Sequence, residues 1–272
     1  MIPSGAIIAS AADTIVGPYE TVNVGGFSTG RETNLNKDWR FYMTTADCSS
    51  VTYSDSSWEN LDLPHDFSIT QSFSKSGNEA ESGYLPGGTG WYRKKLVIPA
   101  SQAGKHFEIN FDGVYMHTYL YVNGTKIGEN HYGYNSFAFD ITDNLVCDGQ
   151  TENVIAVKVV HNLPSSRWYS GSGIYRDVTI VTTDKVHVEH NGTRVSTPNI
   201  ESGNGTVKNV VSVKNDSASS ATVQVRATVY DANNNQVAQA TSSSQSISAN
   251  NSASITVQPV VSSPLLWSTQ AP

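Results

Sequence analysis

The chain is dominated by short runs in which apolar and polar residues alternate. Clear examples are residues 91–98, 107–111 and 154–159, which are rich in β-branched and aromatic side chains. A period of two places alternate side chains on opposite faces of a strand, and these residue types suit a pleated, half-buried surface. No long window carries apolar residues at i, i+3, i+4 and i+7. The sequence therefore predicts an all-β fold.

Two Asn-Gly pairs predict tight hairpins. Asn123-Gly124 lies between the runs 119–122 and 125–128, and Asn191-Gly192 lies between 186–190 and 193–196. Asn and Gly both accept the positive φ angles of a type I′ turn, whose twist matches that of the flanking strands. We therefore expect an antiparallel hairpin at each place.

The composition changes near residue 184 and predicts two domains. All eight Phe, twelve of the thirteen Tyr and four of the five Trp precede that point, whereas Ser, Asn, Val, Ala and Thr dominate after it. The first part indicates a large aromatic-rich sandwich. The second indicates a small sandwich of immunoglobulin type, with short strands separated by turns. Its strands are expected at 186–190, 206–214, 222–230, 236–243 and 254–260.

Charge and hydrophobicity exclude several classes of protein. Apolar residues make up 38% of the chain and charged residues 15%, which is enough apolar surface for true cores. The net charge of −7 argues against a nucleic-acid partner. The basic run Arg93-Lys94-Lys95 lies in an alternating segment and is interpreted as a solvated strand face. No stretch of about 18 apolar residues occurs, so no membrane span is predicted.

Short motifs for cofactors, metals or export are lacking. Cys48 and Cys147 have no metal spacing; a disulfide between them stays open, and two unpaired thiols are favoured. No zinc-protease or EF-hand spacing occurs, so neither a metal nor a cofactor is expected. Residues 1–30 are interpreted as a flexible leader without the basic start of a signal peptide. Low lysine content and the Ser/Thr/Asn-rich second part hint at a bacterial exported or surface protein, and the compartment stays open.

Several motifs of the first part occur in the order and spacing of one enzyme family. They are LNKDWRF at 35–41, WENLDLPHDF at 58–67, GWYRK at 90–94, FDGV at 111–114, YVNG at 121–124, GYNSF at 133–137, FDIT at 139–142 and SRWYSGSGIYRDV at 166–178. Together they resemble the N-terminal sugar-binding domain of family 2 glycoside hydrolases. The sequence SRWY at 166–169 and the glycines before Trp91 look most like the corresponding segments of β-galactosidases. PLLWS at 264–268 resembles the end of the family's next, immunoglobulin-like module.

The resemblance implies a jelly-roll-like, galactose-binding-type β-sandwich over residues 31–183, followed by an immunoglobulin-like β-sandwich over 185–272. We expect the second sandwich to be truncated at its last strand, leaving an unpaired sheet edge. In the family, a (β/α)₈ barrel follows, and two of its glutamates catalyse hydrolysis of the glycosidic bond with retention of the anomeric configuration. That barrel, absent here, would be the chain's partner, and the chain alone is expected to be inactive.

The candidate substrate-binding residues are Arg167, Trp168, Tyr169, His65 and Asp66. An aromatic ring can cover the apolar face of a pyranose, and a guanidinium offers a planar fork of donors. In the family, the loop carrying Arg167 and Trp168 reaches toward the active site of the barrel. These two residues would contact a galactoside or pack against the barrel. For His65, a sugar contact and a local hydrogen bond to Asp66 both stay open.

The glycine-rich segment 86–90 is a second candidate. Some β-galactosidases carry an Asn there that touches sugar, whereas this chain has Gly87, which leaves close backbone approach as its role. The leading functional hypothesis is a non-catalytic fragment of a β-galactosidase-like hydrolase that shapes the active site. An autonomous carbohydrate-binding module or surface adhesin is the alternative, and the ordered motifs count against a purely structural protein.

Overall fold

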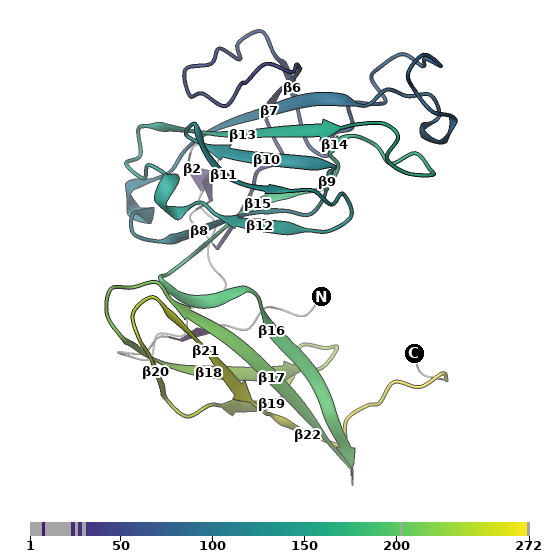
Figure 1. Cartoon of the computed structure of the whole chain (residues 1–272). Coiled ribbons are helices and arrows are strands. Elements are labelled where there is room, and N and C mark those ends of the chain that lie inside the picture. Colours follow the sequence, from purple (N-terminus) through teal and green to yellow (C-terminus); the bar gives the residue numbers. More distant parts are fainter. Residues whose placement is uncertain (1–6, 9–22, 25–26, 29–30, 202, 271–272) are drawn as a thin grey trace. The chain divides into compact units, whose positions relative to one another are not determined.

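The computed structural model describes residues 7–8, 23–24, 27–28, 31–201 and 203–270. The chain divides into two compact units at Thr183/Asp184 (Figure 1). The first sandwich lies before this point. The second sandwich follows it and also includes strand β1 (Ile7–Ile8). The remainder of the leader expected over residues 1–30 lies outside the described residues, apart from the short antiparallel pair β2 (Asn23–Val24) and β3 (Phe27–Ser28).

The larger sheet of the first sandwich has six antiparallel strands in the order β11-β10-β13-β7-β5-β6. Their bounds are β5 Trp39–Met43, β6 Glu59–Leu61, β7 Gly88–Val97, β10 His117–Val122, β11 Thr125–Asn130 and β13 Glu152–His161. The long central strands β7 and β13 contain the alternating runs that the sequence singles out. The prediction of strands there is confirmed.

The smaller sheet has four strands in the order β12-β8-β15-β4. Its strands, the separate pair β9–β14 and three short 3₁₀ turns have the following bounds: β4 Glu32–Asn34, β8 His106–Phe111, β9 Val114–Tyr115, β12 Phe137–Asp140, β14 Gly173–Ile174, β15 Val178–Thr183, η1 Ala80–Ser82, η2 Ala100–Gln102 and η3 Thr142–Asn144.

The core of the first sandwich consists of the inward-facing residues of both sheets. Along β8 and β10 every second residue is buried, as expected for a sheet with one face on a core. Aromatic rings dominate: Phe41 packs on Phe67 and Tyr92, and Phe111 stacks on Phe137. This core explains why the aromatic residues are concentrated before residue 184.

The interpretation of Arg93 as part of a solvated strand face is wrong. Its side chain is 0% exposed and forms an ion pair with Asp55, with Nε 2.9 Å from Oδ2. Its Nη1 donates to the carbonyl oxygens of Cys48 (2.6 Å) and Ser50 (3.1 Å). The segment 44–58 thus covers this part of the sheet, and a buried guanidinium supplies the donors that its carbonyls need.

The Asn123-Gly124 hairpin is confirmed. Val122 pairs with Thr125, and Asn123 and Gly124 have φ angles of 49° and 82°. The Asn123 side chain also donates to Asn144 O and to the Oδ1 of Asn153 on the neighbouring strand β13. The turn is therefore fixed by backbone preference and by hydrogen bonds to distant segments.

The second sandwich contains two antiparallel sheets. In one, β17 lies between β16 and β21 and also pairs with β22; in the other, β18 pairs with β1, β19 and β20. The bounds are β16 Val186–Glu201, β17 Asn204–Asn215, β18 Ala221–Tyr230, β19 Gln236–Thr241, β20 Gln245–Ile247, β21 Asn251–Val257 and β22 Val260–Ser262. Its core is aliphatic: Val211, Val213, Val223, Val225, Ile247, Ile255 and Val257.

The second hairpin prediction is wrong. Strand β16 runs on through Asn191-Gly192, and β17 pairs with it on both sides of that point. The register shifts between Val188, opposite Val213, and Thr193, opposite Val211. Asn191 has a φ of 51°, so the same positive-φ preference that makes a turn here produces a bulge. A local dipeptide does not distinguish the two outcomes.

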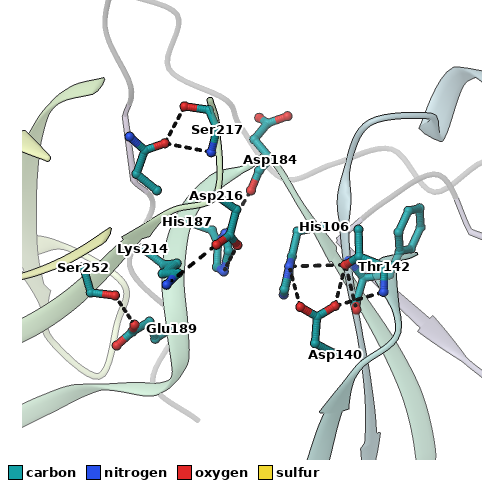
Figure 2. Close-up of polar contacts among 12 residues, drawn as sticks. His106, Asp140, Thr142, Asp184, His187, Glu189, Lys214, Asp216, Ser217 and Ser252 are labelled. Carbon is teal, nitrogen blue, oxygen red and sulfur yellow. Dashed lines mark hydrogen bonds and ion pairs between the residues drawn. The ribbon is translucent and has the colours of Figure 1, made fainter. Parts of the chain in front are cut away.

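Polar side chains fix the beginning of β16 and the end of β17 (Figure 2). His187 Nδ1 lies 3.1 Å from the carbonyl oxygen of Asp184, and its Nε2 lies 3.9 Å from the Asp216 carboxylate. Lys214 lies 3.9 Å from the same carboxylate. Within the first sandwich, Thr142 accepts a hydrogen bond from the backbone N–H of Phe107 at 2.9 Å (Figure 2).

Both cysteines are free, Cys48 being buried and Cys147 half-buried. Burial raises the pKa of each thiol. The chain therefore carries two protonated structural thiols at neutral pH. Among the described residues, no helix has the length and apolar character needed to cross a bilayer.

Candidate functional site

Trp168 is the most exposed large aromatic residue among the sequence-predicted site residues. It lies in the loop between β13 and β14, and 59% of its surface is exposed. Its indole Nε1 donates to the hydroxyl of Tyr134 at 3.0 Å, and the two ring centroids are 6.4 Å apart. Tyr134 in turn contacts Tyr115 edge-on at 5.3 Å and Tyr132 at 5.8 Å. The indole is thus exposed and also held by a hydrogen bond.

Tyr169 and Asp66 lie together, although they are distant in the sequence. The Tyr169 hydroxyl donates to Asp66 Oδ2. Asp66 Oδ1 accepts from the backbone N–H groups of Ser68 (2.9 Å) and Ser172 (2.8 Å). Both carboxylate oxygens are therefore engaged in joining two loops. Burial and the Asp66 hydrogen bond raise the pKa of Tyr169 above the usual range, so its phenol stays a donor.

His65 points toward the core instead. Its Nδ1 lies 2.8 Å from the Tyr92 hydroxyl, and its ring contacts Phe41 edge-on at 4.7 Å. Burial lowers its pKa, so the imidazole is neutral at neutral pH. Its hydrogen-bond partner is Tyr92 rather than Asp66, which corrects the local pairing considered from the sequence. The structure brings Asp66, Trp168 and Tyr169 to one pair of loops and places His65 beneath them.

A buried hydrogen-bond network lies under the Trp168 loop. His161, at the end of β13, has its Nδ1 2.5 Å from Ser172 Oγ and its Nε2 2.8 Å from Ser165 Oγ. Ser172 Oγ lies 2.5 Å from Ser68 Oγ, which donates to the Pro86 carbonyl at 2.7 Å. Burial lowers the pKa of His161 to about 4. A neutral imidazole with one donor and one acceptor nitrogen fits between two hydroxyls.

Close backbone contacts explain two glycines around this network. A Cβ on Gly87 would lie 2.3 Å from the carbonyl oxygen of His161, so the backbone of the 86–90 segment approaches that of β13 closely. Gly173 has a φ of 116°, and a Cβ there would lie 2.3 Å from the Tyr92 hydroxyl. Any larger residue at either place would displace the loop that carries Trp168.

Arg167 lies on the same loop with an exposed side chain. Within the part of the chain that the structure describes, its guanidinium has no hydrogen-bond or ion-pair partner. An exposed, always-charged fork of donors is available for hydroxyls or for a carboxylate. The loop therefore carries a planar donor, Arg167, and an exposed aromatic ring, Trp168, on consecutive residues.

Sequence reasoning missed Tyr115, Tyr132, Tyr134 and His161. Tyr134 belongs to the GYNSF motif, whose resemblance was recognised without a role for its tyrosine. Its contact with Trp168 spans 34 residues, and that between Tyr115 Oη and Ser165 Oγ (3.2 Å) spans 50. Only the folded topology joins these segments. The signal that could have found them is the clustering of Tyr132 and Tyr134 in a turn.

Two domain families account for most of the chain. Residues 33–184 match the sugar binding domain of glycosyl hydrolases family 2, and residues 186–272 match a second domain of the same family. Among curated proteins, a β-galactosidase from Bacteroides ovatus is 38% identical over 88% of this chain. A putative β-glucuronidase from Formosa agariphila is 36% identical over 89% of it.

Solved structures give the same result. A glycosyl hydrolase family 2 member from Bacteroides cellulosilyticus superposes with a TM-score of 0.80 at 32% identity, over 89% of this chain and 32% of its own. The chain spans only 28% of the Bacteroides ovatus protein and 22% of the Formosa agariphila protein. The matched region is thus the N-terminal part of much longer proteins.

Proposed function

Because the chain belongs to glycosyl hydrolases family 2, we propose that it forms the non-catalytic N-terminal part of a β-galactosidase-like hydrolase. In this proposal a (β/α)₈ barrel supplies the two catalytic carboxylates, and the first sandwich shapes the substrate site. The small share of each relative that the chain covers supports this division. Asp66, the carboxylate among the five candidate residues, is engaged through both oxygens.

The exposed and hydrogen-bonded Trp168 carries the proposal. A ring that is 59% exposed contributes little to a core, yet Tyr134 and the anchored loop fix its orientation. A fixed aromatic face reduces the entropy lost on binding and suits the C–H face of a pyranose. Arg167 beside it would donate to sugar hydroxyls. The second sandwich has a purely supporting role in this proposal.

A terminal β-galactoside is the proposed substrate, and a β-glucuronide is the second candidate. The relatives include both kinds of enzyme at similar identity. A glucuronide differs by a carboxylate, which the free fork of Arg167 could bind in a bidentate manner. Substituting Arg167 with Gln removes the charge and keeps a hydrogen-bond donor. It should weaken interaction with a glucuronide more than with a galactoside.

The test is a paired assay on the chain itself. With p-nitrophenyl β-D-galactoside and β-D-glucuronide we expect no turnover above buffer, since the catalytic pair lies elsewhere. Titration with methyl β-D-galactoside, followed by NMR, should give at most weak shifts confined to residues 165–172 and 132–134. Hydrolysis by the chain would overturn the proposal.

An autonomous carbohydrate-binding module is the alternative, favoured by the group of exposed rings at Tyr132, Tyr134 and Trp168. It requires saturable galactoside binding, with a Kd of millimolar or lower, that is lost in Trp168→Ala. Tyr230→Ala, which removes an exposed ring of the second sandwich, is the matched control. Binding that survives Trp168→Ala would argue against both uses of this loop.

A further inference from the structure

Two histidines extend the β10–β11 ladder on its outer face. The last backbone pair is Thr118 with Asn130, and His117 and His131 are the next residues on either side. Their Nδ1 atoms are 3.2 Å apart, and their ring centroids are 5.2 Å apart. In Figure 1 the two strands lie side by side in the larger sheet. Sequence spacing gives no sign of this pair, because 14 residues separate its members.

The spacing of the two nitrogens matches a shared metal ion. Two imidazole nitrogens that each lie about 2.0–2.1 Å from one tetrahedral ion are roughly 3.3 Å apart. In the metal-free protein the same separation is bridged by one proton, so one nitrogen donates and the other accepts. An ion could replace that proton without movement of the strands. The ring of His117 would then carry its hydrogen on Nε2.

Glu129 supplies the partner that a metal-binding histidine normally has. Its Oε1 lies 3.1 Å from Nε2 of His131, the nitrogen that would not bind the ion. A carboxylate at that place keeps the hydrogen on Nε2 and directs the lone pair of Nδ1 toward His117. The other oxygen, Oε2, is held 2.6 Å from Lys126 Nζ.

From this geometry we propose that His117 and His131 form a two-nitrogen site for a divalent transition-metal ion, oriented by Glu129. Imidazole nitrogens select Zn²⁺, Cu²⁺ and Ni²⁺, whereas Mg²⁺ and Ca²⁺ require oxygen ligands. The exposed side of the site leaves the remaining positions to water or to a donor from a ligand. The ion would cross-link the end of β11 to β10. Tyr132 and Tyr134, next in the chain, would be held with it.

Two lysines set an upper limit on the affinity. Lys126 and Lys158 both lie over the ring of Tyr119, at 5.2 and 5.7 Å from its centroid, and Tyr119 contacts His131 edge-on. The positive charges of the two lysines repel a cation at this face, although the ion pair with Glu129 neutralises the charge of Lys126. With two protein ligands, we expect micromolar rather than nanomolar binding.

The test is titration with Zn²⁺, followed by calorimetry and by the imidazole NMR signals of each histidine. We expect one ion per chain at this site, with the His117 and His131 signals shifting together. His117→Gln or His131→Gln should each weaken the site at least 100-fold. Glu129→Gln should weaken it about tenfold, in the range seen for second partners of metal ligands. Mg²⁺ should shift neither signal.

His190→Gln, which removes an exposed histidine of the second sandwich, is the matched control and should leave the site unchanged. Circular dichroism of each variant without metal establishes that it folds. Zinc that leaves the two signals unmoved, or binds both single variants as tightly as the original chain, would overturn the proposal.

Discussion

The two sandwiches share a class of fold but differ in how they use polar groups. The first buries aromatic rings together with an arginine, a histidine and several hydroxyls, and it includes long-range hydrogen bonds such as Arg93 to Asp55 and between Ser68 and Ser172. The second fills a small core with valine and isoleucine. Among its described residues, Asn215 is a fully buried polar side chain, and it donates to the carbonyls of Ser219 and of Ile247 in β20.

The difference explains where a site can form. Buried polar anchors hold irregular loops in one conformation, because their groups are satisfied only in that arrangement. Such anchors hold the loop of Trp168 through His161, Ser172 and Asp66. An aliphatic core supports strands but does not direct loops. The candidate site therefore belongs to the first sandwich.

The largest expected effect comes from Arg93→Met. It leaves Asp55 and the carbonyls of Cys48 and Ser50 without their donor and should cost about 3–5 kcal/mol. In calorimetry, the transition of the first sandwich should fall by roughly 6–20 °C, while that of the second stays. Arg176→Met, at an exposed guanidinium, is the control and should change little. If both transitions shifted together, the two sandwiches would not unfold independently, which would contradict this prediction.

Acid should weaken the first sandwich through His161. Its pKa is about 4 in the folded chain, because burial disfavours the cation, against about 6.5 when unfolded. The unfolded chain therefore takes up a proton at higher pH. The stabilisation is complete above pH 6.5 and falls as the pH approaches 4, by at most about 3 kcal/mol. His161→Gln should flatten this dependence in thermal melts between pH 7 and 4, and an equally steep melt series in that variant would refute the assignment.

Asn215→Ala should affect only the second sandwich. Its Nδ2 donates to the carbonyls of Ser219 (2.9 Å) and Ile247 (3.0 Å), which would lose a buried donor. The expected cost is about 1–3 kcal/mol by urea unfolding. Asn233→Ala, on an exposed turn, should stay within about 0.5 kcal/mol. An Asn215 variant as stable as the control would mean that the second sandwich does not depend on its buried polar group.

The smallest effect on stability is expected for Trp168→Ala. Its exposed ring contacts mainly Tyr134, so unfolding free energy should change by about 0.5 kcal/mol or less. The role proposed for this ring is contact with a ligand. A loss above about 2 kcal/mol would instead make Trp168 a packing residue.

The strands of both sandwiches could be predicted because alternation is a local signal. The Asn123-Gly124 hairpin followed from turn chemistry, whereas Asn191-Gly192 became a bulge because β17 pairs with β16 on both sides of it. Whether a neighbouring strand pairs on both sides of an Asn-Gly dipeptide depends on residues far away in the sequence. The local sequence therefore could not predict the bulge.

The candidate site could be predicted in part. Trp168, Tyr169 and Asp66 were recognised by their motifs, and the Tyr169–Asp66 hydrogen bond spans 103 residues. His161 lies at the end of a strand and carried no motif. Arg93 looked like a surface charge because its partner Asp55 is 38 residues away in a covering segment. Burial of polar groups depends on such long-range partners.

The anchoring of the Trp168 loop by Asp66 can be measured directly through amide hydrogen exchange. The amides of Ser68 and Ser172 both donate to Asp66 Oδ1, whereas the Val213 amide belongs to the second sandwich. In Asp66→Ala, exchange at Ser172 should accelerate at least about tenfold, which corresponds to a lost hydrogen bond of about 1.4 kcal/mol, and Val213 should be unaffected. Unchanged protection of Ser172 would contradict the view that buried polar anchors hold the site.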